Sequence, residues 1–237
     1  MTSPARPNSW GYVHFLELVI SKVKSRGGAL RFAAYVVALA VAPPIVAVAL
    51  PSAAVAAEIT KADFFKPGLA PVRSKGAYDV TVVYFIDYQC PVCRQHSNEY
   101  ARVFSEEPKV RVIYRDTPIF GPQSEVAARL AIASQFQGKH EAFHLALMRS
   151  KGRLTDAAIR EAAAKAGVNW SRLQQDLAAR KAQIDAQIAM NMRLSEAAGI
   201  SGTPAFIVGD KLADGAYDYA GLKGEIADAR AEARKGR

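Results

Sequence analysis

Two cysteines separated by two residues are the side chains in this sequence best suited to redox or metal chemistry. Cys90 and Cys93, in the stretch DYQCPVCR, are the only cysteines among 237 residues. A static disulfide between them would close so short a loop that it would remove little entropy from the unfolded chain. A zinc site would need two more ligands, for which His140 and His144 are candidates because they lie four residues apart on an expected helix.

The expected local structure favours a third use, a redox dithiol. The stretch VTVVYFID (80–87) is rich in β-branched and aromatic residues and predicts a buried strand. Pro91 suits the first turn of a helix, which places Cys90 at the N-cap and Cys93 inside the first turn. Free N–H groups and the helix dipole favour a thiolate there, so the pKa of Cys90 should fall below that of a free cysteine. Cys93 should be less exposed and act as the resolving thiol.

The distance along the chain between the two cysteines and the two histidines disfavours zinc. It far exceeds the usual spacing of ligand pairs in zinc fingers. The histidines, within GKHEAFHLALMR, are readily explained as part of a half-exposed helix.

Strand patterns occur on both sides of a long helical region. A second strand is predicted at 110–115 (VRVIYR), soon after a helix that runs from Pro91 to about Glu107. Strand character returns at 204–209 (PAFIVG), continues weakly through KLADGAY, and is followed by a charged helix over 219–235. The order of strands and helices predicts an α/β sheet with an inserted helical subdomain.

The region between these strands is all-helical, because Ala, Gln, Leu and charged residues recur there at helical spacing. Thr155 and Asn169 are expected N-caps, and Gly138, Gly152 and Gly167 mark boundaries. The expected helices are 123–137, 139–150, 155–166, 169–179 and 181–198.

Residues 1–57 have the pattern of an export signal or a membrane anchor. A basic segment ending at Arg31 precedes an uncharged, Ala/Val-rich run over 32–57, whose last residues include an A-x-A pattern. A segment over 58–79, rich in Pro and Gly, then leads into the first strand. Whether this segment is an export signal or a membrane anchor, we expect the rest of the chain to lie in the periplasm or another extracytoplasmic compartment, where disulfides persist.

Charge and composition exclude some classes of function. The net charge is +9, of which residues 1–57 contribute +4 from five basic side chains and one acidic one, which leaves +5 for the rest. The remaining charges are mixed in sign and lack the basic run expected of a nucleic-acid face. We therefore expect no nucleic-acid partner.

Two stretches together, YFIDYQCPVCR and GTPAFIVG, resemble the DsbA-like branch of the thioredoxin superfamily. The resemblance covers about residues 70–230. It implies a thioredoxin fold made of 80–121 and 200–237, interrupted by a helical insertion over 122–199.

The resemblance also implies roles for the residues around the cysteine pair. In the family the proline that matches Pro204 is cis and lies beside the active-site sulfurs. The residue that matches Thr203 offers backbone hydrogen bonds to an extended substrate segment. Pro91 and Val92, between the two cysteines, would support the pair.

One position departs from the family pattern. A carboxylate often lies six residues before the first cysteine, where it is thought to help move a proton to or from the buried thiol, but this chain has Tyr84 there. Asp87 matches a common family residue, and its position at the strand end suggests that it orients the loop.

The function implied is that of a monomeric thiol:disulfide oxidoreductase that forms disulfides in exported proteins by exchange through Cys90 and Cys93. No cofactor is expected, but a membrane or small-molecule redox partner must recycle the pair. Three alternatives stay open at this point: a reductase or isomerase of the same fold, a peptide-binding module without enzymatic activity, and a zinc protein.

Overall fold

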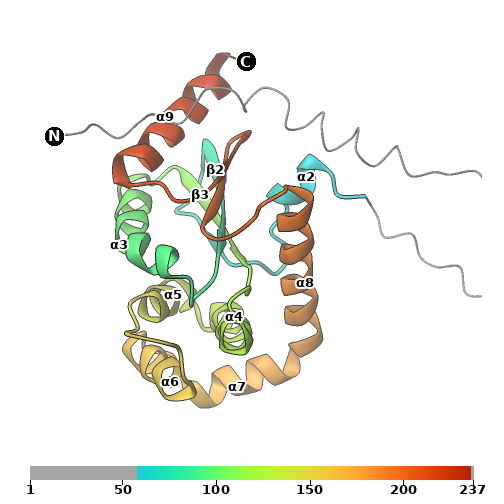
Figure 1. Cartoon of the computed structure of the whole chain (residues 1–237), viewed down its shortest axis with the longest axis vertical. Helices are drawn as coiled ribbons and strands as arrows, with labels where there is room; N and C mark the ends of the chain where they lie inside the picture. The colour runs from blue at the N-terminus through green and yellow to red at the C-terminus, as the bar shows by residue number, and fades with distance from the viewer. Residues whose placement is uncertain (1–57, 236–237) are drawn as a thin grey trace, which may run out of the picture. The chain divides into compact units, whose positions relative to one another are not determined.

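A five-stranded mixed sheet lies at the centre of residues 58–235, which are the residues described by the computed structural model (Figure 1). The strand order is β1-β3-β2-β4-β5. Strands β2 (Val80–Ile86) and β3 (Val110–Asp116) are parallel, and β4 (Ala205–Val208) pairs with β2 in the antiparallel direction. The expected signal or anchor over 1–57 lies outside the described residues. Within 58–235 no helix is both long and apolar enough to cross a membrane.

The segment over 58–79 contains regular structure that its sequence pattern does not predict. It forms the short helix α2 (Lys61–Phe65) and the edge strand β1 (Val72–Arg73), which pairs with β3. Both elements are too short to show a helical or strand periodicity in the sequence. β1 is a strand because it pairs with β3. The other edge is β5 (Lys211–Asp214), which is shorter than the KLADGAY stretch.

Helices cover both faces of the sheet. Figure 1 shows α3 (Pro91–Glu106) and α9 (Tyr219–Lys235) on one side of β2, and α2 and α8 (Lys181–Ala197) on the other. Six of the seven residues of β2 are buried, as expected of a central strand with helices on both faces. On the face that packs into the main core, the strand contributes Val82, Tyr84 and Ile86.

The helical insertion has the five expected helices, with small shifts at their ends. Thr155 and Asn169 cap α6 and α7 as predicted, since their side-chain oxygens accept the N–H groups of Ala158 and Arg172. The range 123–137 differs from the prediction because its last three residues form a 3-10 turn, which ends at Gly138 with a φ of 65°. The remaining bounds are α4 Pro122–Ser134, α5 His140–Met148, α6 Asp156–Lys165 and α7 Trp170–Ala179.

A buried arginine joins the insertion to the segment before the sheet. The guanidinium of Arg115 donates to the carbonyl oxygens of Lys66 at 2.7 Å, Phe64 at 3.1 Å and Pro67 at 3.3 Å. It also donates to Oδ1 of Asn191 on α8, at 3.2 Å. The carbonyl groups at the end of α2 lack partners within that helix, so the cation satisfies them and stabilises the helix dipole.

Candidate active site

The two cysteines lie where β2 ends and α3 begins, as the sequence predicts. Cys90 is the N-cap of α3 and Pro91 is its first residue. The sulfur of Cys90 accepts a hydrogen bond from the backbone N–H of Cys93 at 3.4 Å. Both cysteines are buried and carry free thiols in this structure. The sulfur therefore takes the position of the oxygen acceptor that usually caps a helix.

A second segment, far away in the sequence, meets the cysteine pair. The Thr203–Pro204 peptide bond is cis, and the thiol of Cys90 donates to the carbonyl oxygen of Thr203 at 3.0 Å. Pro204 is buried immediately before β4, which pairs with β2. This pairing brings the predicted residues Cys90, Thr203 and Pro204 into one site.

The two thiols differ strongly in acidity although both are buried. Hydrogen bonds from the Cys93 side chain and from backbone N–H groups lower the pKa of Cys90 to about 6, against the effect of burial. Burial and the neighbouring Cys90 raise the pKa of Cys93 far above that of a free thiol. Cys90 is 1% exposed and Cys93 0%, so the expected difference in exposure is very small. Cys90 is therefore the thiol that carries a thiolate at neutral pH, and Cys93 stays protonated.

Asp87 holds the loop that carries the cysteines. Its Oδ1 atom accepts from the N–H of Gln89 and the hydroxyl of Ser124, each at 2.7 Å. Its Oδ2 atom accepts from the N–H groups of Ile119 at 2.7 Å and Phe120 at 2.9 Å. The side chain is 1% exposed. One carboxylate thus fixes the redox loop to the start of the insertion.

Gln89 is a residue of the site that the sequence analysis missed. Its amide nitrogen donates to the carbonyl oxygen of Phe120 at 3.0 Å and to the Ser124 hydroxyl at 3.3 Å. Its amide oxygen accepts from the N–H of Leu154 at 3.3 Å. No local pattern marks such a residue, because its partners belong to two other loops. Its position next to Cys90 was the only available signal.

Tyr84 is a packing residue at the position where the family often has a carboxylate. Its ring stacks on Phe206 at a centroid distance of 4.6 Å and meets Tyr100 edge to face at 5.5 Å. Among the described residues its buried hydroxyl has no hydrogen-bond partner. Burial, followed by the charge of Cys93, raises its pKa well above 10. Tyr84 therefore cannot exchange a proton with Cys93 by ionising near neutral pH.

The two candidate zinc ligands lie in the core and not on a half-exposed surface. His140 and His144 face inward on α5, 7% and 4% exposed, with their rings 5.9 Å apart. Nδ1 of His144 lies 3.3 Å from the hydroxyl of Tyr88. Burial lowers the pKa of both rings, that of His144 to about 3. Within residues 58–235 no three His, Cys, Asp or Glu side chains come together as metal ligands would.

A buried acid lies at the end of β3, level with Ile86 on β2. Asp116 is 0% exposed, and its carboxyl group lies beside the buried hydroxyl of Tyr88, which lowers its pKa against the larger effect of burial. Burial raises its pKa to about 8, so this carboxyl group is mostly protonated at neutral pH.

Comparison with known proteins identifies similar proteins with related chemistry. The family model described as a DSBA-like thioredoxin domain matches residues 81–227. A thioredoxin-like oxidoreductase from Silicibacter pomeroyi DSS-3 is 38% identical, with a TM-score of 0.68 over 73% of this chain and 99% of its own. The thiol-disulfide exchange protein alpha-DsbA2 from Wolbachia pipientis is 28% identical, with a TM-score of 0.67 over 71% of this chain and 90% of its own.

Two further matches are to a periplasmic protein and to one part of a much longer antiporter. A periplasmic thioredoxin-like protein from Salmonella enterica serovar Typhimurium is 29% identical, with a TM-score of 0.66 over 74% of this chain and 99% of its own. The Na(+)/H(+) antiporter NhaA 1 of Salinispora arenicola is 28% identical over 69% of this chain. The matched region spans only 25% of the antiporter, so this chain corresponds to about a quarter of that relative.

The acidity of Cys90 predicts how its alkylation depends on pH. With a pKa of about 6, the thiolate fraction and hence the rate of reaction with iodoacetamide should rise about tenfold from pH 5 to pH 7 and then level off. The rate can be measured by mass spectrometry of the modified peptide. In the urea-unfolded chain the rise should move toward pH 8.5, the pKa of a free cysteine. A rise at the same pH in the folded and unfolded chains would contradict the assignment.

The buried carboxyl of Asp116 predicts a pH-dependent stability. The folded protein retains a proton that the unfolded chain releases above pH 4, so the free energy of unfolding should fall by about 1.4 kcal/mol per pH unit toward pH 8 through this group alone. Urea unfolding of the wild type and of Asp116→Asn should show the asparagine variant gaining relative stability as pH rises from 5 to 8. The slope is informative even if the amide packs poorly, since that cost does not depend on pH. If the difference in unfolding free energy between the two proteins is the same at pH 5 and pH 8, Asp116 does not hold a proton in the folded protein.

Proposed function

Because this chain belongs to the DSBA-like thioredoxin domain family and is a thiol-disulfide oxidoreductase of that family, we propose that it forms disulfide bonds in exported proteins. The observation that carries this proposal is the difference between the two thiols. Cys90 has a pKa lowered to about 6, whereas the pKa of the buried Cys93 is raised. Only Cys90 is thus suited to carry the mixed disulfide.

The reaction proceeds by two exchanges. A substrate thiolate attacks the sulfur of Cys90 in the Cys90–Cys93 disulfide, and Cys93 leaves and takes up a proton. A second substrate thiolate then attacks the substrate sulfur of the mixed disulfide, and Cys90 leaves as a thiolate. The substrate loses two electrons and gains a disulfide, while the enzyme pair gains two electrons. A membrane or small-molecule oxidant reoxidises the pair, and no cofactor takes part.

The acidity of Cys90 favours oxidation of the substrate over its reduction. At pH 7 a pKa of about 6 stabilises the reduced enzyme by about 1.4 kcal/mol relative to an ordinary thiol. For a two-electron couple this raises the reduction potential by about 30 mV. The same thiolate is also the better leaving group in the second exchange, which speeds release of the substrate.

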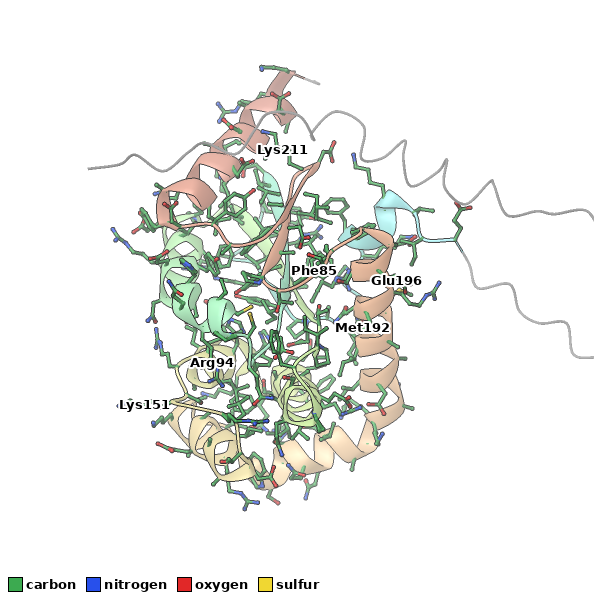
Figure 2. The ribbon with its side chains drawn as sticks, viewed as in Figure 1. Phe85, Arg94, Lys151, Met192, Glu196 and Lys211 are labelled. Atoms are coloured by element: carbon green, nitrogen blue, oxygen red, sulfur yellow. The ribbon has the colours of Figure 1, made fainter. Side chains whose placement is uncertain are left out.

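Surfaces near Cys90 suit an unfolded protein segment. Only the thiol form of Cys90 can donate to the Thr203 carbonyl, so that acceptor is free for a substrate N–H when Cys90 is a thiolate or a disulfide. Val92 and Ile119 are 40% and 43% exposed. A groove of about 380 Å³ beside the Thr203 loop, lined in part by Ile119 and by Met192 on α8 (Figure 2), suits an apolar side chain.

The compartment follows from two considerations. The similar Salmonella protein is periplasmic, and the sequence of residues 1–57 has the pattern of an export signal or anchor. An oxidising compartment outside the cytoplasm also supplies the reduced, newly exported substrates that such an enzyme needs. We assign the enzyme to the periplasm or an equivalent space, as a monomer without a nucleic-acid partner.

Single substitutions of the two cysteines test the mechanism. Cys90→Ser should abolish oxidative refolding of a reduced model protein, because no sulfur remains to form the mixed disulfide. Cys93→Ser, incubated with a substrate that already contains a disulfide, should trap mixed disulfides, visible on non-reducing gels as adducts that dithiothreitol removes, because the Cys90 thiolate can attack that disulfide but no Cys93 thiol remains to displace the substrate. Circular dichroism of both variants controls for folding. A Cys90→Ser protein that still oxidises its substrate would rule out the proposal.

The reduction potential decides the direction of electron flow. Equilibration of the pair with a glutathione series should give a value more positive than the value of about −270 mV for thioredoxin, by about 20 mV from the acidity of Cys90 alone, because the thioredoxin cysteine has a pKa of about 7. The oxidised fraction can be read by trapping free thiols and measuring the mass. A potential at or below that of thioredoxin would instead identify a reductase.

A further inference from the structure

A loop of the helical insertion borders the redox loop. The segment between α5 and α6 (149–155) contacts it at two points: the N–H of Leu154 donates to the side chain of Gln89 at 3.3 Å, and Nη1 of Arg94 donates to the carbonyl oxygen of Gly152. Nε of Arg94 also donates to the carbonyl oxygen of Tyr88 at 2.6 Å. The residues before and after the cysteine pair therefore fix the position of this loop.

Four cations lie on this border, which we call the basic rim: Arg94, Arg149, Lys151 and Arg153. The last three are exposed, and Figure 2 shows Lys151 on the loop near Arg94. Arg149 donates to Oδ1 of Asn98 at 2.8 Å, which holds it toward α3 without neutralising it. The only acidic residue between Ala142 and Arg160 is Asp156.

The rim gathers several cations without ion pairs beside the redox loop. Other cations pair along their helices, as Arg102 does with Glu106 and Lys165 with Glu161. Within residues 58–235 no member of the rim pairs with a carboxylate. With Asp156 counted, and Asp87, whose charge acts on Arg94, counted as well, the four cations leave a net charge of +2. Such an uncompensated charge beside a reactive group attracts anions and steers their approach.

We propose that the basic rim binds carboxylate side chains near the reacting cysteine of the substrate, so that the enzyme prefers acidic segments. The inference rests on the proposed function and names the substrate class for it. Thr203 contacts Cys90 itself, and the rim loop contacts Gln89 next to Cys90, so a substrate segment held at the Thr203 carbonyl lies within one residue of the loop that carries the rim. Charge at that position raises the association rate without requiring a fixed geometry, which suits a partner that is unfolded.

Peptide substrates with two cysteines test the preference. Two peptides of the same sequence, with either aspartate or lysine beside each cysteine, are mixed with the oxidised protein, and reduction of the Cys90–Cys93 disulfide is followed in a single turnover. At low salt the acidic peptide should react about tenfold faster or more. The ratio should fall toward one in 0.5 M salt, where charges are screened. Equal rates at low salt would overturn the proposal.

Charge reversal on the rim has a matched control. The variant Lys151→Glu/Arg153→Glu leaves Arg94 and its loop contacts in place, and should remove or invert the preference. The control Lys75→Glu/Lys109→Glu makes the same change in net charge at exposed positions that precede β2 and β3, whereas Cys90 follows the other end of β2. The control should keep the wild-type ratio. If both variants change the ratio equally, net charge and not the rim is responsible.

A second readout does not depend on oxidase activity. Cys90 in the reduced protein is alkylated with the anion iodoacetate and with neutral iodoacetamide, and the ratio of the two rates is compared between variants. The rim variant should lower the iodoacetate rate several-fold relative to iodoacetamide, and the control should not. If peptides are not oxidised but this ratio shifts, the proposed function fails and the rim stands. If neither ratio differs between rim variant and wild type, the rim is refuted.

Discussion

The site depends on one sulfur atom that begins a helix. Where β2 ends and α3 starts, the first free N–H groups of the helix need an acceptor, and Cys90 supplies one in place of an oxygen. An anion satisfies those groups better than a neutral thiol, so the structure of the junction itself makes the cysteine acidic. Cys93, one turn later, lies inside the core, where burial raises its pKa and keeps the thiol protonated. The difference in acidity between the two thiols, on which thiol–disulfide exchange depends, thus follows from their positions in the first turn of α3.

The sequence was most informative where structure is local. The buried strand, the N-cap at Cys90, and the caps at Thr155 and Asn169 depend on neighbouring residues, and all of them could be predicted. The carboxylate of Asp87 could be placed at the strand end, but its bonds to Ile119 and Ser124 join segments more than thirty residues apart. Such contacts depend on how the insertion packs against the sheet, which no local pattern records.

The core beside the site is unusually polar, which the sequence analysis did not anticipate. Asp116, His140 and Tyr84 are all buried there. Burying such groups costs free energy, and burial raises the pKa of Asp116 and lowers that of His140, which favours the neutral form of each. The sequence predicts these histidines on a half-exposed helix, because spacing shows that two side chains share a helix face but not that the face is buried.

The bond between Cys90 and Thr203 joins residues 113 positions apart. A ribosome that adds roughly 5–20 residues per second makes the cysteines several seconds before the threonine. During that interval the pair is part of an incomplete chain, without the sheet partner and the carbonyl that define its surroundings in the finished protein. The enzyme's own cysteines therefore begin as ordinary thiols of a nascent polypeptide, and they acquire their distinctive chemistry only when β4 has paired with β2.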